Sequence, residues 1–169
     1  NAGYGYFEPF LTDSASDVRQ MFQVNVLALM TVTRAFLPDM MVQQSGQIIN
    51  IASIASYMAT AKTTAYAATK FAVRGFSDAL RQEVAAANVK VLVVNTGPVL
   101  TKFHAANPDY LEKVGKNAVT PAFVAQKIVA HLQTNKRELN LPWQLNLARI
   151  FAINFPNAAD KITRRFFNI

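Results

Sequence analysis

Cysteine is absent from this sequence of 169 residues, which excludes disulfide bonds and thiolate metal sites. Histidine is scarce, and His104 and His131 are too few and too far apart to predict a zinc site. No uninterrupted apolar run approaches the ~18 residues that a membrane-spanning helix requires. No signal peptide is visible either. We therefore expect a cytoplasmic protein without a metal site.

Acidic residues are also few, with 10 against 17 lysines and arginines, and the net charge is +7. Such a charge attracts phosphates, nucleic acid and anionic membranes. The basic residues are scattered, however, and the one tight pair beside aromatic residues is Arg164-Arg165, before Phe166-Phe167. This pattern does not predict nucleic-acid binding. Hydrophobic residues make up 51% of the chain, which indicates that some apolar surface is buried against a partner.

Apolar periodicity predicts helices and strands in alternation along one domain, residues 1–169. Residues 1–13 are expected to form a loop, and Ser14 is placed to cap the helix that follows. Pro38 should bend that helix or end its regular part. Strands separated by long helices are typical of a parallel α/β sheet with right-handed crossovers. We expect helices over 15–43, 63–87, 120–134, 143–155 and 158–167, and strands over 47–53, 90–95 and 138–141.

Three polar side chains are predicted to converge at one edge of this sheet. Tyr66 and Lys70 stand four residues apart in the helix over 63–87, so both project from one helical face, one turn apart. Ser53 is expected at the carboxyl end of the preceding strand, and ligands of open α/β sheets bind at that edge. The order and spacing of the three residues therefore predict a common crevice.

A phenol beside an ammonium group is suited to proton transfer. A free tyrosine has a pKa near ~10, and lowering it to ~7 takes roughly 4 kcal/mol. One cation about 4 Å away supplies roughly that much at an effective dielectric constant of ~20. Lys70 is therefore a sufficient cause if it is held close to Tyr66, and Ser53 is placed to hydrogen-bond the reacting oxygen. Taken singly, each feature has an ordinary explanation, as a solvated helix face or as a residue in a turn.

Taken together, the motifs resemble the short-chain dehydrogenase/reductase family, whose signature is a serine followed by Tyr-x-x-x-Lys. The resemblance extends over about residues 1–101. It implies a Rossmann-like, doubly wound parallel sheet, of which this chain would be the C-terminal, catalytic half without the N-terminal strands. The segments that carry it are NAG at 1–3, FQVN at 22–25, INIAS at 49–53, YAATKFAV at 66–73 and NTGPVLT at 95–101.

The resemblance implies an NAD(P)-dependent oxidoreductase that interconverts a ketone or aldehyde and an alcohol by hydride transfer. Tyr66 would be the general acid in reduction and the general base in oxidation, and Ser53 would orient and polarise the substrate oxygen. Lys70 would lower the pKa of Tyr66 and hydrogen-bond the nicotinamide ribose. Asn25 would hold a water that links Lys70 to solvent. The small-molecule carbonyl or alcohol itself is not identified.

The resemblance also implies where cofactor and substrate would bind. The NAG segment would lie along the adenosine half of the cofactor, and the segment from Gly97 to Thr101 would meet the nicotinamide end. Residues 101–120 would form the substrate loop. Four of its apolar residues would either line a pocket or pack: Phe103, Tyr110, Leu111 and Val114. The expected cofactor contacts are Asn1, Ala2, Gly3, Tyr66, Lys70, Gly97, Pro98, Val99 and Thr101.

Two departures from the family pattern limit these expectations. Thr96 stands where the family usually has proline, which leaves the geometry of the cofactor loop open. The glycine-rich turn that seats the pyrophosphate on a helix N-terminus is not in this sequence, so NAD and NADP are both candidates. We expect the chain of 169 residues alone to be inactive, because remote binding energy from the pyrophosphate and adenosine positions the nicotinamide.

Self-association is expected through the two long helices, over 15–43 and 63–87, as a homodimer or homotetramer. Leu27, Met30 and Val32 cannot all face one sheet, so the first helix requires a second partner. Two other functions stay open. One is a non-catalytic interaction module of the same fold. The other is a membrane-associated reductase that uses its basic, aromatic C-terminal segment as an interfacial anchor.

Overall fold

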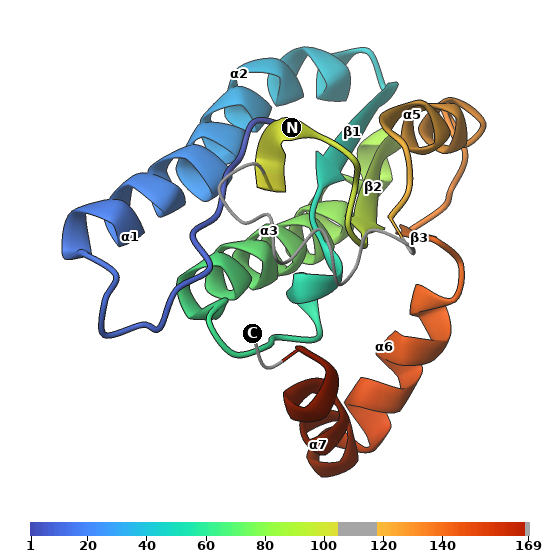
Figure 1. The fold of residues 1–169 in the computed structure, drawn as a ribbon. Coiled ribbons are helices and arrows are strands. Elements are labelled where there is room, and N and C mark those ends of the chain that lie inside the picture. The colour runs from blue at the N-terminus through green and yellow to red at the C-terminus, as the bar shows by residue number, and fades with distance from the viewer. Residues whose placement is uncertain (105–117, 168–169) are drawn as a thin grey trace.

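In the described part of the chain, three parallel strands form a sheet with helices on both faces (Figure 1). The computed structural model describes residues 1–104 and 118–167. Strand β2 (Val89–Thr96) lies between β1 (Gly46–Ile51) and β3 (Glu138–Leu141), and both pairings are parallel. The α/β class and the parallel sheet predicted from the sequence are therefore confirmed.

The helices follow the predicted order, although some begin or end elsewhere. The helix expected over 63–87 ends as an α-helix at Glu83 and is followed by a 3-10 turn. The strand expected over 47–53 ends at Ile51, because Ser53 already caps the next turn. The helices are α1 (Ala15–Phe22), α2 (Ala28–Val42), α3 (Thr64–Glu83), α5 (Pro121–Val129), α6 (Leu145–Asn154) and α7 (Pro156–Phe167), with the 3-10 turns η2 (Ile54–Ser56), η3 (Ala85–Ala87) and η4 (Lys102–His104).

Side chains of β2 enter two apolar layers, because successive strand residues point to opposite faces. Val89 and Val91 pack on one face with residues of α2 and α3. Leu92 and Val94 pack on the other face with residues of α5. Helices therefore cover both faces, which makes the sheet doubly wound and explains why β2 is almost entirely buried.

The long helix predicted over 15–43 is interrupted by a π-helix, η1 (Gln23–Leu27), between α1 and α2. Its start is as predicted, because the Ser14 side chain accepts a hydrogen bond from the backbone N–H of Asp17 at 3.1 Å. Pro38 lies inside α2, which continues to Val42, so this proline does not end the helix. Sequence periodicity did not predict η1.

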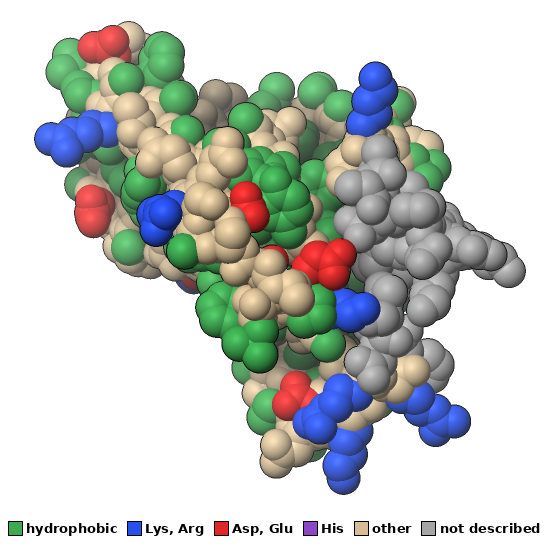
Figure 2. All heavy atoms as spheres, turned by 60° about the vertical axis from the view of Figure 1, so that its left-hand side comes forward, with side chains coloured by type: hydrophobic (Ala, Val, Ile, Leu, Met, Phe, Trp, Pro, Cys, Tyr) green, Lys and Arg blue, Asp and Glu red, His purple; other side chains and the backbone are tan. Residues whose placement is uncertain are grey.

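By length and composition alone, the segment Ala15–Val42 is long and apolar enough to cross a membrane. In the structure it packs against α3 and the sheet, with Met21, Asn25 and Val26 buried. Its opposite side is apolar but exposed, and Figure 2 shows this side of the molecule with hydrophobic and polar side chains interspersed. The segment therefore buries one side against the domain, and most of it, including apolar side chains on its outer face, stays exposed.

Candidate active site

Tyr66 is buried in α3, and its ring packs against two phenylalanine rings that also contact each other. The ring centroid lies 5.4 Å from that of Phe7 and 5.7 Å from that of Phe103, and these two rings lie 6.1 Å apart. Gly5 runs so close that a Cβ there would lie 2.7 Å from Cδ2 of Tyr66. The N-terminal loop and η4 therefore enclose the tyrosine in an aromatic cluster, Phe7–Tyr66–Phe103.

Lys70 lies one helical turn after Tyr66 and is also buried, at 8% exposure. Its Nζ is 5.6 Å from the centroid of the Tyr66 ring and donates a hydrogen bond to the carbonyl oxygen of Ile51 at 3.3 Å. Burial lowers the pKa of Lys70 from 10.5 to about 8, because desolvation disfavours the charged form. The structure thus holds a partly desolvated cation beside a phenol.

Ser53 lies just beyond β1 and near the end of β2. Its Oγ accepts a hydrogen bond from the backbone N–H of Ala55 at 3.2 Å, which caps η2. The same Oγ donates to the carbonyl oxygen of Thr96, at 3.5 Å. Ala55 belongs to the apolar cluster that contains Tyr66, so the turn that begins at Ser53 packs against the tyrosine. The structure therefore brings Ser53, Tyr66 and Lys70 to the carboxyl edge of the sheet, where ligands of such sheets bind.

Asn25 is 1% exposed and fastens the N-terminal loop to α3. Its Oδ1 accepts from the backbone N–H of Tyr4 at 3.0 Å, and its Nδ2 donates to the carbonyl oxygen of Tyr4 at 2.8 Å. Nδ2 also donates to Oγ1 of Thr69 at 3.1 Å. Asn25 lies in η1, and a π-helical turn often marks a functional position in a helix. Its expected role in holding a water stays a prediction.

One of the residues expected to contact the cofactor, Gly3, lies beside Lys70. A Cβ on Gly3 would be 3.0 Å from Oδ1 of Asn25 and 3.7 Å from Nζ of Lys70, so this part of the loop passes directly beside the ammonium group. Asn1 and Ala2 precede Gly3 in this loop and are exposed. Their proposed contact with the adenosine half stays a prediction.

The backbone after β2 is held on two sides. The N–H of Gly97 donates to the carbonyl oxygen of Leu141 at 2.8 Å. The carbonyl oxygen of Pro98 accepts from the N–H of Val119 at 3.0 Å, which forms a bridge beside Val99. Thr101 follows as an exposed residue, and its Oγ1 accepts from the N–H of Phe103. Of the residues expected to line the substrate loop, Phe103 contacts Tyr66, whereas Tyr110, Leu111 and Val114 lie outside the described residues.

A chain of buried amides beneath this edge was not found from the sequence. Oδ1 of Asn95 accepts from Oγ of Ser56 at 3.0 Å, and its Nδ2 donates to Oδ1 of Asn140 at 2.9 Å. The hydroxyl of Tyr57 donates to the same oxygen at 3.2 Å, and Nδ2 of Asn140 donates to Oδ1 of Asn146 at 2.7 Å. Burial raises the pKa of Tyr57. The sequence feature that could have indicated this chain is the presence of Asn95 and Asn140 within otherwise apolar strands.

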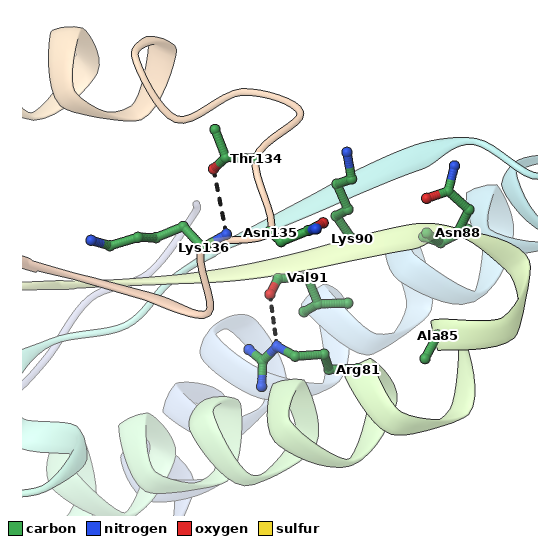
Figure 3. A pocket seen from close by; sticks show the side chains of 9 residues that line it. Arg81, Ala85, Asn88, Lys90, Val91, Thr134, Asn135 and Lys136 are labelled. Atoms are coloured by element: carbon green, nitrogen blue, oxygen red, sulfur yellow. Dashed lines mark hydrogen bonds between the residues drawn. The ribbon is translucent and has the colours of Figure 1, made fainter.

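A hollow of about 240 Å³ lies at the opposite end of β2 and is lined by several cations (Figure 3). Arg81 donates through Nε to the carbonyl oxygen of Val91 at 2.9 Å and through Nη1 to Asp78 at 2.7 Å. Lys90 donates to the carbonyl oxygen of Gln133. These cations are occupied by neighbouring groups of the fold, so the hollow is not a candidate for the chemistry.

Comparison with known proteins decides the family. Residues 1–111 match the family model described as short chain dehydrogenase. The chain belongs to the short-chain dehydrogenase family. The matched region includes the candidate catalytic residues and the expected cofactor contacts, from the NAG segment to Thr101. The resemblance inferred from the motifs is therefore confirmed.

Relatives within the short-chain dehydrogenase family align with much or all of the chain. It is 35% identical over 103 residues to the uncharacterized oxidoreductase YbbO of Escherichia coli strain K12, which is 61% of this chain and 38% of that protein. It is 29% identical over 173 residues to estradiol 17-beta-dehydrogenase 11 of Rattus norvegicus, which is 100% of this chain and 56% of that protein. The chain thus spans about half, or less, of the length of these relatives.

A solved structure of the family shows the same Rossmann-like fold. It is the putative NAD(P)-dependent gluconate 5-dehydrogenase of Beutenbergia cavernae, which contains bound NADP at low occupancy. The two chains superimpose with a TM-score of 0.77 at 26% identity, over 87% of this chain and 64% of that one. The doubly wound fold expected from the sequence is confirmed by this likeness.

Proposed function

We propose that this short-chain dehydrogenase is an NAD(P)-dependent oxidoreductase that interconverts a ketone or aldehyde and an alcohol, with Tyr66 as its general acid and base. The observation that carries the proposal is the buried ammonium group of Lys70, 5.6 Å from the centroid of the Tyr66 ring. Burying a cation without a carboxylate is unfavourable. When Tyr66 gives up its proton during the proposed reaction, the resulting phenolate can form an ion pair with the Lys70 ammonium group.

The residues around Lys70 fit a nicotinamide cofactor. Within the described part of the chain, its Nζ donates one hydrogen bond, to Ile51, so two further N–H groups can reach ribose hydroxyls. Gly3 keeps the adjoining backbone free of a side chain. The relative from Beutenbergia cavernae binds NADP, which supports a cofactor of this class here. The choice between NAD and NADP stays open.

The proposed reduction requires one hydride and one proton. A reduced nicotinamide cofactor, when bound beside Lys70, would supply the hydride for the carbonyl carbon. Tyr66 donates its phenolic proton to the carbonyl oxygen as negative charge develops there, and the Ser53 hydroxyl hydrogen-bonds the same oxygen. The phenolate left on Tyr66 is stabilised by Lys70 until a proton from solvent replaces the one transferred. Oxidation of the alcohol follows the same steps in reverse.

A direct assay tests this function. NADH and NADPH are each supplied to the full-length gene product together with a panel of aliphatic, aromatic and steroid ketones, and the loss of reduced nicotinamide is followed. We expect turnover with at least one ketone, together with formation of its alcohol. Absence of turnover over the whole panel, with saturable cofactor binding intact, would favour the non-catalytic module.

The aromatic cluster supports the further proposal that the substrate is apolar next to its carbonyl group. Replacing Phe103 with alanine removes apolar surface beside Tyr66 and should raise KM for an aromatic ketone by roughly tenfold, equivalent to about 1.4 kcal/mol of lost contact. KM for acetone should change by less than about twofold, because acetone is too small to span the same surface. Equal changes for both ketones would contradict this role.

We also propose that the protein self-associates through the outer face of the long helix, with α3 beside it. On this face Val32 and Phe36, four residues apart, are 58% and 62% exposed, and such apolar helix faces require a partner. Phe36→Glu should convert the oligomer to a monomer in light scattering at micromolar concentration. Leu11→Glu is the control, because Leu11 is 97% exposed in the N-terminal loop. A monomeric wild-type protein would contradict the proposal.

A further inference from the structure

The outward face of α6 is apolar, although it lies on the surface. Leu147, Ile150 and Phe151 are 59%, 53% and 38% exposed. At 100° per residue these three positions occupy one side of the helix, opposite to Leu145 and Ala152, which are partly buried. A surface helix normally presents polar residues on that side. Among residues 1–104 and 118–167, nothing covers this face.

Exposed aromatic side chains stand at both ends of this face. Trp143 precedes α6 and is 64% exposed, and Phe155 follows it and is 60% exposed. Trp is enriched where a protein meets the boundary between hydrocarbon and headgroups, because its ring is apolar with one polar N–H. We define this set of five exposed residues as the α6 apolar face: Trp143, Leu147, Ile150, Phe151 and Phe155.

Exposed cations lie on α7, the helix that packs against α6. Lys161, Arg164 and Arg165 are exposed, and they are opposed within that helix by the carboxylate of Asp160. The Arg164 side chain is 73% exposed, and its Nη2 stands 4.0 Å from the carboxylate. Figure 2 shows Lys and Arg side chains gathered at the lower end of the molecule, where α7 lies in Figure 1.

Packed helices have axes about 8–10 Å apart, which is close to the Debye length of ~8 Å at physiological ionic strength. An anionic surface that contacts the α6 apolar face therefore also experiences the charges of α7. Apolar insertion together with cations beside it is the combination that binds anionic bilayers in the interfacial plane. The net charge of +7 also attracts the protein to an anionic membrane at longer range.

We propose that α6 and α7 form a docking surface for an anionic lipid bilayer, with the α6 apolar face inserted among the headgroups. The helix lies flat on the membrane and does not cross it, because ten residues span only about 15 Å. Its inner side is fixed to the domain, where Arg149 pairs with the Glu138 carboxylate of β3 at 3.3 Å. Docking therefore leaves the sheet and the candidate active site unchanged.

The test uses the chain of 169 residues and two kinds of vesicle, one of phosphatidylcholine and one containing phosphatidylglycerol. We expect co-sedimentation with the anionic vesicles that weakens as salt is added. The double change Leu147→Asn and Ile150→Asn keeps the charge and should reduce binding by at least tenfold, because both residues lose their insertion into lipid. Val129→Asn is the control, because Val129 is 65% exposed on α5 and lies outside the α6 apolar face.

A second pair of changes separates charge from insertion. Arg164→Glu with Arg165→Glu lowers the charge by four units, so binding to the anionic vesicles should fall by roughly 600-fold, at roughly fivefold for each unit, and binding to phosphatidylcholine should stay unchanged. All variants alter exposed residues and should keep the thermal transition of the wild type. Failure of the wild-type chain to bind anionic vesicles overturns the proposal. Conversion of an oligomer to a monomer by the Leu147/Ile150 change also overturns it, because a second copy would then cover this face.

Discussion

Replacing Tyr66 with phenylalanine should lower kcat for ketone reduction by ~10² to 10⁴-fold, the usual weight of general acid–base catalysis. The change removes the transferable proton and keeps the ring, which packs against Phe7 and Phe103. The aromatic cluster should therefore remain, and KM should change little. Steady-state kinetics with a ketone that the wild-type enzyme reduces would measure both quantities.

The matched control for this change is Tyr57→Phe. Tyr57 is also buried and also loses only a hydroxyl, which donates to Asn140 in the amide chain below the site. Its loss should lower the free energy of unfolding by about 1 kcal/mol and leave kcat within a few-fold. If Tyr66→Phe and Tyr57→Phe have the same small effect on kcat, Tyr66 is not the proton donor.

Lys70→Met should reduce activity and increase stability, two effects of opposite sign. The loss of the cation removes the group that stabilises the Tyr66 phenolate, so kcat should fall by at least about tenfold and the pH optimum for oxidation should move upward. The burial of Lys70 lowers its pKa from 10.5 to about 8, a penalty of about 3 kcal/mol on the folded state at neutral pH. The lost hydrogen bond to Ile51 offsets about 1 kcal/mol of that penalty.

The lowered pKa of Lys70 also predicts how the unfolding free energy changes with pH. Because the folded-state pKa of Lys70 is lower than the unfolded one, the unfolded chain binds more protons between about pH 8 and pH 10.5. The penalty is fully present below pH 8 and disappears as the pH rises towards 10.5. The unfolding free energy of the wild type should therefore rise over this window relative to that of Lys70→Met.

Urea unfolding of the wild type and of Lys70→Met at several pH values would measure the predicted difference. Lys127→Met on α5 is the control, because Lys127 is exposed and its loss should change stability by less than about 0.5 kcal/mol. A Lys70→Met variant that is less stable than the wild type at pH 7 would show that the cation supports the fold. That result would contradict the prediction that burial of the charged Lys70 side chain lowers the stability of the folded protein.

The sequence predicted the elements of the site that depend on local spacing. Tyr66 and Lys70 share a face because helical geometry places residues four apart together, and Ser53 follows β1 because a short β-branched run ends there. Thr120 was expected to precede a helix, and its side chain accepts from the N–H of Phe123 as an N-cap. That helix was expected to reach Thr134 and ends earlier.

The sequence did not predict features that depend on contacts between distant segments. The π-helix η1 coincides with the hydrogen bonds from Asn25 to Tyr4 and Thr69, and no local pattern encodes such partners. Phe7 lies in a loop without periodicity, so its place against Tyr66 was not visible. The same limit applied to the amide chain, because the pairing of Asn95 with Asn140 requires the register of β2 against β3.

If Tyr66 gives a proton to an oxygen whose carbon receives a hydride from a nicotinamide cofactor, the origin of both hydrogens can be traced. The most direct measurement uses NADH or NADPH with two deuterium atoms at C4 of the nicotinamide and analyses the alcohol product by mass spectrometry and NMR. We expect one deuterium on the carbinol carbon with the wild-type enzyme, and with Tyr66→Phe a rate of labelled product lower by ~10² to 10⁴-fold. Alcohol without deuterium at that carbon, or labelled alcohol formed equally fast by both proteins, would contradict the proposed function.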